Sequence, residues 1–342
     1  MNDIGAVGTP RPTGLALPHV GIAATTAIVK HDPLKPVLML FLATTCWGLS
    51  FPLMRGLVLA QQQLTPSVSV WFITAQTLVI RFGLAAIVMV LFFYRRMWPV
   101  TWLELKLGLG LGVFAGVGTL FQMAALETTP SSTSAFLTQF TVLLVPLWLA
   151  VVHRKRPSLL LGVCCVLVIA GMAVLCGAHW NDLQLKRGEW LTLLAAALFT
   201  GDILWLDRRE FVAADKLRAT VVMFATIAAV LAPVAIGSAP GNTDWARAYQ
   251  TPAVLAMLAL LLGASTLVAF TIMNIWQPHI APTHATLIYC AEPVFASVYA
   301  LFLPGWLAQL GRFDFANETL TSHLWLGGGL ITLANILIQR DR

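Results

Sequence analysis

Ten apolar stretches, each about as long as a bilayer-crossing helix, occupy most of the chain. A hydrocarbon core about 30 Å thick requires about 20 predominantly apolar residues in a helix. Within the bilayer, backbone polar groups must be paired inside their own segment, so each stretch is predicted to be helical. The predicted spans are 36–58, 68–92, 103–125, 131–152, 158–178, 188–207, 217–236, 253–276, 283–304 and 323–339.

The composition supports this pattern. The 342 residues are 58% hydrophobic and only 11% charged, whereas soluble domains carry about 25% charged residues. The chain is therefore predicted to be an all-α polytopic membrane protein. Residues 1–35 contain no apolar run with a basic start and a small-residue cleavage site, as a signal peptide would have. We expect a disordered cytoplasmic tail there.

Lysine and arginine are concentrated in alternate connections between the spans. If the amino terminus is cytoplasmic, 15 of these residues fall in inside regions and 4 in outside regions. Cytoplasmic loops normally carry such an excess. We therefore expect both termini in the cytoplasm and the protein in a bacterial inner membrane. The net charge of +6 is explained by this placement, so no nucleic-acid partner is predicted.

Short motifs recur at a nearly constant offset along the chain. The recurrences, at offsets of 147 to 152 residues, are Thr119-Leu120 with Thr266-Leu267, Pro130 with Pro282, and Pro146 with Pro293. Two halves with an odd number of spans each cross the bilayer in opposite directions. The pattern thus predicts ten transmembrane helices in two inverted five-helix repeats, 36–178 and 188–339, with a site near the midplane.

The span 283–304 carries a carboxylate, Glu292, near its middle, followed directly by a proline, Pro293. A charge at bilayer depth is costly and marks a functional site by default. Proline removes a backbone donor and disturbs the preceding turn. Pro293, and Pro146 in the fourth span, are therefore predicted to kink their helices.

Arg81 lies near the middle of the second span, at a depth similar to that of Glu292. Three relations between them remain open. They form a structural ion pair, they act directly in transport, or they do not touch. In a transport role, Glu292 would exchange a proton or contact a substrate amine, and Arg81 would bind a substrate carboxylate. Tyr289 shares the helix face of Glu292 by its three-residue spacing.

Three further polar or aromatic side chains within spans are candidate site residues. Trp47 in the first span and Gln139 in the fourth are suited to stacking on and orienting a small solute, with ordinary packing as the alternative. Asp202 lies toward the cytoplasmic end of the sixth span. It lies near Arg208 and Arg209 and is either a carboxylate that snorkels to the interface or pairs locally, or part of a cytoplasmic gate or proton path.

The span 103–125 carries a stripe of glycines, among them Gly112 and Gly116 at four-residue spacing. Small residues at this spacing allow neighbouring helices to approach closely. Close helix packing is the favoured interpretation of this stripe, and a gating role is the alternative.

The order of several motifs resembles the EamA-type proteins of the drug/metabolite transporter superfamily. The similar stretches are Cys46-Trp47-Gly48, Ala135–Pro146 (AFLTQFTVLLVP) and Gln277–Phe295 (QPHIAPTHATLIYCAEPVF). The resemblance covers about residues 36–338. It implies ten helices in two inverted repeats, a central cavity, and export or exchange of small metabolites.

The chain departs from that family at one motif. EamA-type proteins often carry a Gly-Glu pair after the fourth span of each half. Here residues 153–157 read His-Arg-Lys-Arg-Pro, and in the second half Glu318 stands in, behind an insertion-like loop at 305–317. This departure weakens assignment to a subfamily and leaves the expected fold unchanged.

We therefore predict a secondary active transporter of small organic metabolites, amino-acid-like or drug-like, that exports by proton exchange through alternating access. Facilitated diffusion or uptake is the alternative. A transporter-fold sensor or scaffold, or a membrane-embedded enzyme, is less favoured, because zinc, phosphate-loop and nucleophile motifs are absent from the sequence.

No cofactor or metal is expected. The expected partners are a small-molecule substrate, protons and the bilayer. Substrate identity and oligomeric state stay open.

Overall fold

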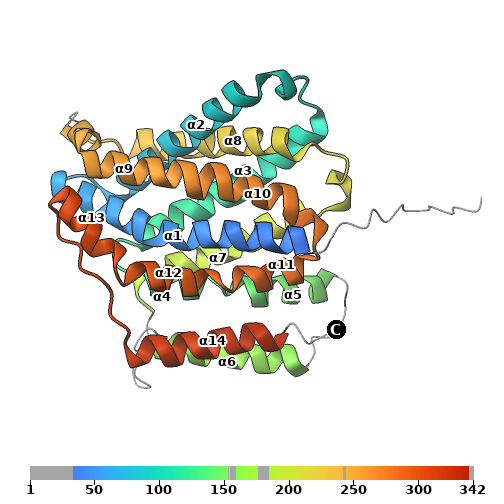
Figure 1. Cartoon of the computed structure of the whole chain (residues 1–342). Helices are drawn as coiled ribbons and strands as arrows, with labels where there is room; N and C mark the ends of the chain where they lie inside the picture. Colours follow the sequence, from blue (N-terminus) through green and yellow to red (C-terminus); the bar gives the residue numbers. More distant parts are fainter. Residues whose placement is uncertain (1–33, 153, 155–158, 176–184, 242–243, 339–342) are drawn as a thin grey trace, which may run out of the picture.

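The computed structural model describes residues 34–152, 154, 159–175, 185–241 and 244–338. All regular structure in these described residues is helical (Figure 1). The α-helices are α1 Leu34–Leu64, α2 Val70–Met97, α3 Trp102–Ala125, α4 Ser131–Thr138, α5 Thr141–Val152, α6 Leu159–Leu175, α7 Arg187–Leu206, α8 Lys216–Gly237, α9 Pro252–Leu260, α10 Ala269–Trp276, α11 Pro282–Tyr289, α12 Glu292–Ala300, α13 Leu303–Gly311 and α14 Ser322–Ile338. Shorter helical segments are η1 Arg209–Phe211, η2 Asp244–Gln250, the π-helical η3 Leu261–Val268, and η4 Gln277–His279.

Seven helical segments of the described chain are long and apolar enough to cross a membrane. An eighth is obtained if His284–Ala300 and Leu303–Gly311, which meet at a bend of 50°, count as one span. The helices α6 and α14 have 17 residues each, fewer than the about 20 residues that a full span requires. The protein is thus a multi-pass helical membrane protein, and this criterion counts seven or eight spans in the described chain, where ten were predicted. Residues 1–33 of the predicted tail lie outside the described residues.

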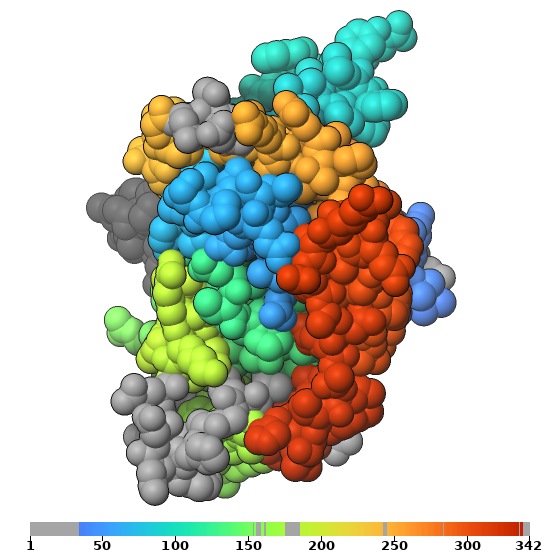
Figure 2. Space-filling view, turned by 90° about the vertical axis from the view of Figure 1, so that its left-hand side faces the viewer, coloured from blue at the N-terminus to red at the C-terminus, as the bar shows by residue number. Residues whose placement is uncertain are grey.

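The helices form one main bundle and one separate pair. In Figure 1, α6 and α14 lie side by side below the other helices, next to α4 and α5. In the main bundle, α3 packs between α7 and α8, and α1 runs along α10 and α12. Figure 2 shows the end of the bundle at which α1 finishes, where the red segment containing α13 lies against the blue end of α1. We call this the Leu64 end.

The glycine stripe of α3 lies at close helix contacts. A Cβ atom added at Gly116 would lie 3.2 Å from Ile227 of α8, and one at Gly118 would lie 2.7 Å from Phe199 of α7. The separation at Gly118 is shorter than real Cβ atoms show, and that at Gly116 is tighter than nine in ten real Cβ contacts. The close packing expected of this stripe is confirmed.

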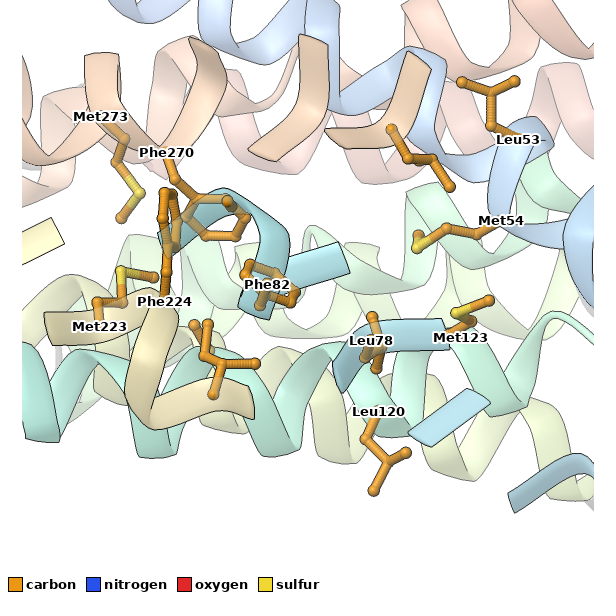
Figure 3. Close-up of a cluster of buried hydrophobic side chains, with 14 of the residues drawn as sticks. Leu53, Met54, Leu78, Phe82, Leu120, Met123, Met223, Phe224, Phe270 and Met273 are labelled. Atoms are coloured by element: carbon orange, nitrogen blue, oxygen red, sulfur yellow. The ribbon is translucent and has the colours of Figure 1, made fainter. Parts of the chain in front are cut away.

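Aromatic side chains hold α2, α8 and α10 together in the interior. The ring centroids of Phe82 and Phe224 are 5.7 Å apart, and those of Phe82 and Phe270 are 5.9 Å apart. Figure 3 shows these three rings close together, with Met223 and Met273 beside them. Aromatic pairs at this distance add about 0.5–1.5 kcal/mol beyond their burial. This cluster fixes the part of α2 that carries Arg81.

Two helical segments are interrupted at corresponding points. The break between α4 and α5 is at Gln139–Phe140, and that between α11 and α12 is at Cys290–Ala291. At both breaks, backbone N–H groups bond to the carbonyl three residues earlier, for example Phe140 to Leu137 and Ala291 to Ile288, each at 3.1 Å. The breaks are 151 residues apart, within the range of offsets seen in the sequence.

The two prolines predicted to kink these helices lie at different distances from the breaks. Pro293 is the second residue of α12, where its missing N–H leaves no hydrogen bond unmade. Pro146 lies inside α5, which continues to Val152. The interruption before α5 therefore precedes Pro146 by more than one helical turn.

Glu318, in the loop between α13 and α14, ties that loop to the first half of the chain. Its carboxylate accepts hydrogen bonds from the backbone N–H groups of Ser131 and Ser132, at 2.6 and 3.3 Å, and from the Ser132 hydroxyl. It also pairs with Arg55 of α1 at 3.2 Å. A carboxylate is favourable at a helix N-terminus, here that of α4.

Gly48 permits a close approach between α1 and α12. A Cβ atom there would lie 2.6 Å from the Cβ of Phe295 and 3.0 Å from the backbone nitrogen of Ala296. We expect Gly48→Val to lower the free energy of unfolding by about 1–3 kcal/mol through overpacking. A thermal unfolding scan of the purified protein measures this change.

Gly162→Val is the matched control, because a Cβ atom at Gly162 meets nothing within 4 Å. Its unfolding free energy should change by no more than about 0.5 kcal/mol. Equal thermal unfolding midpoints for Gly48→Val and Gly162→Val would contradict the assigned contact between α1 and α12.

Candidate functional site

A cavity of about 680 Å³, part of it open to the outside, lies within the main bundle. Helices α1, α2, α3, α4, α5, α7, α10, α11 and α12 contribute side chains to it. All six site residues predicted from the sequence line this cavity: Trp47, Arg81, Gln139, Asp202, Tyr289 and Glu292. The lining also includes ten residues that were not predicted: Ser50, Met54, Thr119, Gln122, Thr138, Thr141, Phe199, Ile203, Phe270 and Met273.

The two helix interruptions meet at this cavity. Gln139 follows the last residue of α4, and Glu292 is the first residue of α12. The Gln139 side-chain amide donates a hydrogen bond of 3.1 Å to Glu292 Oε2. Glu292 is 8% exposed. The breaks thus bring a polar amide and a carboxylate together inside an apolar bundle.

Arg81 is held by neutral partners rather than by Glu292. Its Nε donates to the hydroxyl of Thr266, and its Nη1 lies 3.8 Å from the sulfur of Met54. Among the ion pairs of the described residues, none joins Arg81 to Glu292. The structural ion pair, one of the three alternatives, is therefore absent from this structure.

Aromatic rings form one wall of the cavity. The ring centroid of Trp47 lies 5.5 Å from that of Tyr289 and 5.4 Å from that of Phe270, both edge to face. The Tyr289 hydroxyl donates a 2.8 Å hydrogen bond to the side-chain oxygen of Gln277. The amide of Gln277 in turn donates to the backbone carbonyl of Ile203 on α7, at 3.3 Å. These bonds fix the Tyr289 ring between α7 and α11.

Asp202 projects from α7 into the cavity and is 3% exposed. The local pairing considered for it is not found, because Arg208 pairs instead with Glu210 at 3.1 Å. Within the described residues, no ion pair involves Asp202. The cavity is therefore lined by two carboxylates, Asp202 and Glu292, and by the guanidinium of Arg81. In the described residues, no ion pair joins any two of these groups.

Three of the lining side chains carry a buried polar atom without a hydrogen-bond partner in the described residues. These atoms are Trp47 Nε1, Gln139 Oε1 and Asp202 Oδ1. Buried polar groups are nearly always hydrogen-bonded, so each such atom requires an explanation. One donor and two acceptors around a single cavity are the groups that would orient a polar solute.

Thr266 is a further residue beside the cavity that the sequence pattern did not predict to contact Arg81. This residue lies in η3, the π-helical segment between α9 and α10, and contacts Arg81 directly. The recurrence of Thr119-Leu120 as Thr266-Leu267 pointed to both threonines without suggesting a role. Because the π-helical geometry cannot be read from apolar periodicity, no sequence signal placed Thr266 against Arg81.

Comparisons with known proteins give a family match and a shared fold. Residues 34–177 match the model of the EamA-like transporter family. No curated protein matches the chain. One solved crystal structure matches with a TM-score of 0.55 and 19% sequence identity, over 89% of this chain and 96% of the other. At this identity the similarity shows a shared fold alone, and it extends beyond the family match into the second half of the chain.

The family match and the cavity concern the same helices. Residues 34–177 include α1 to α5, which supply Trp47, Arg81 and Gln139. The apolar helices that surround the cavity are those of a multi-pass membrane protein. Residues 34–177 of the chain thus match the EamA-like transporter family, a family of the drug/metabolite transporter superfamily.

Proposed function

We propose that this protein is a secondary active transporter that exports a small organic metabolite by proton exchange, with alternating access to the cavity. The observation that carries the proposal is the set of ionisable and unsatisfied polar groups within apolar helices. Two carboxylates and a guanidinium line one cavity in the described part of the chain, and three of the lining side chains carry a buried polar atom without a hydrogen-bond partner there. Ionisable groups at bilayer depth are expensive, and they mark substrate and proton pathways.

The proposed frame consists of ten helices in two inverted repeats, 36–178 and 188–339. The matching interruptions of α4–α5 and α11–α12 support it, since they are 151 residues apart. Broken helices near the midplane at a repeat interface form the sites of many secondary transporters. The alternation of basic loops supports two cytoplasmic termini in a bacterial inner membrane.

Glu292 is the proposed proton site. It is buried, and its side-chain partner in the described residues is the neutral amide of Gln139. A buried carboxylate without a cation is costly in its ionised form. Binding of a proton or of a cationic solute relieves that cost, so the two compete for the same group. Such competition is what exchange transport requires.

Aromatic and amide side chains suit an amino-acid-like or drug-like solute. Trp47, Tyr289 and Phe270 present ring faces and edges, while Gln139 offers a free acceptor. Small-molecule sites are typically apolar with a few polar groups that fix orientation. Tracer flux into proteoliposomes, measured for a metabolite panel, tests the proposal. Absence of flux for every member, with folded protein, would refute it.

Replacement of Glu292 separates proton coupling from solute binding. We expect Glu292→Gln to retain exchange of labelled for unlabelled solute at reduced affinity, because the amide keeps the shape of the side chain but loses its charge. Uphill transport driven by a pH gradient should be lost, because the amide cannot take up a proton. Proteoliposome assays with and without the gradient measure both activities.

Glu210→Gln provides the control for that experiment, because Glu210 lies at an exposed ion pair outside the cavity. Exposed pairs contribute only about 0–1 kcal/mol, so this variant should keep uphill transport. Unchanged uphill transport in Glu292→Gln would exclude Glu292 as the coupling group.

Glu318 is proposed to hold the Leu64 end closed. Its loop belongs to the second half, while Arg55, Ser131 and Ser132 belong to the first. Movement of the halves apart at that end must break these bonds. Under the predicted orientation, the Leu64 end faces the outside. Glu318→Gln removes the charge of this side chain and weakens its hydrogen bonds. The variant should therefore favour the state in which the cavity is open to the outside.

Thiol labelling tests this closure. Ser50 lines the cavity, so Ser50→Cys in a cysteine-free background reports access from outside to an impermeant thiol reagent. Loss of charge at Glu318, worth about 1.5–3 kcal/mol, should raise the labelling rate at least about tenfold. Glu210→Gln in the same background should not change it. A labelling rate that stays the same in Glu318→Gln would refute the closure.

A further inference from the structure

The π-helical segment η3 connects to two other helices through two neighbouring side chains. The hydroxyl of Ser265 donates a 2.9 Å hydrogen bond to the backbone carbonyl of Cys46 on α1. The hydroxyl of Thr266 accepts from Arg81 on α2. Both residues are fully buried. Runs of π-helix are rare and frequently occur at functional sites, so the contacts of this segment are informative.

The hydrogen bonds of Thr266 have a fixed direction. Its hydroxyl has one proton, which it donates to the carbonyl of Leu261, five residues earlier, at 3.0 Å. Its lone pairs therefore remain as acceptors, and the guanidinium of Arg81 has donors only. The π-helical turn thus presents an acceptor that is already oriented toward Arg81 Nε.

This contact leaves one edge of the guanidinium uncommitted. Arginine carries five N–H donors in a planar fork. In the described residues, Nε bonds to Thr266 and Nη1 contacts the sulfur of Met54, which is a weak acceptor. Arg81 lines the cavity. The remaining Nη donors are therefore available to a solute that binds there, and a planar fork matches a carboxylate through two parallel bonds.

We propose that Thr266 is a positioning residue that orients Arg81, and that the free guanidinium edge is a subsite for a carboxylate group of the bound solute. The inference rests on the proposed function, because it assigns a ligand chemistry to the same cavity. Without the Thr266 hydroxyl, the guanidinium is free to rotate and its bidentate geometry is lost.

Two probes of nearly equal shape, one with a negative charge and one without, test whether the site prefers a carboxylate. Benzoate carries a carboxylate, and benzamide replaces it with a neutral amide. The affinity of each for the purified protein is obtained from the rise in its thermal midpoint with probe concentration. We expect the wild-type protein to prefer benzoate. Thr266→Val should weaken benzoate binding about tenfold, the size of one hydrogen bond to a charged group, and change benzamide binding less than about twofold.

Two further variants distinguish positioning from packing. Thr266→Ser retains the hydroxyl and should keep the benzoate affinity of the wild-type protein. Thr44→Val removes the hydroxyl of another fully buried threonine, which donates to its own helix at the carbonyl of Leu40 and lies outside the cavity lining. It should leave benzoate affinity unchanged. Because Thr266→Ser keeps the polar contact, it remains a valid test if Thr266→Val does not fold.

Three results would overturn the inference: equal wild-type affinities for benzoate and benzamide, unchanged benzoate affinity in Thr266→Val, or loss of benzoate affinity in Thr266→Ser. Because binding is measured without transport, the outcome is separate from that of the proposed function. A preference for benzoate without flux of any metabolite would refute transport alone. Flux without this preference would refute the carboxylate subsite alone.

Discussion

The pairing of backbone polar groups inside the bilayer is the constraint on which the rest of this structure depends. Departures from α-helical bonding are tolerated there only where protein or a cavity surrounds them. The described chain has such departures between α4 and α5, in η3, and between α11 and α12. All three lie at or beside the same cavity. These three irregular stretches and the candidate site therefore coincide, because a cavity can accommodate irregular backbone.

The charged groups of the cavity are separated rather than neutralised by each other. Glu292 is held by an amide, Gln139, and Arg81 by a hydroxyl, Thr266. Removal of one member of a buried ion pair typically costs about 3–5 kcal/mol because the other charge is left uncompensated. With neutral partners, each charge can meet a proton or a solute without first breaking an ion pair. This arrangement suits a binding site better than a structural bridge.

The contacts at the Leu64 end complement those within the cavity. Glu318 neutralises Arg55 and caps α4, so one carboxylate connects a second-half loop to two first-half helices. The close contacts of Gly48 and of the α3 glycines allow the helices around the cavity to pack tightly. The bundle therefore combines close helix contacts near the cavity with charge-assisted polar bonds at its Leu64 end.

The sequence alone determined the class of protein and six residues that line the cavity, because apolar length predicts spans and polar groups in a span must face protein or water. All six predicted residues line the cavity: Trp47, Arg81, Gln139, Asp202, Tyr289 and Glu292. Only the tertiary structure decided which side chains meet. Arg81 contacts Thr266 instead of Glu292, and the break before α5 lies well before Pro146. These outcomes depend on helix tilt and on the π-helical turn of η3, which set the distances between residues far apart in sequence. Neither feature can be predicted from the periodicity of apolar residues.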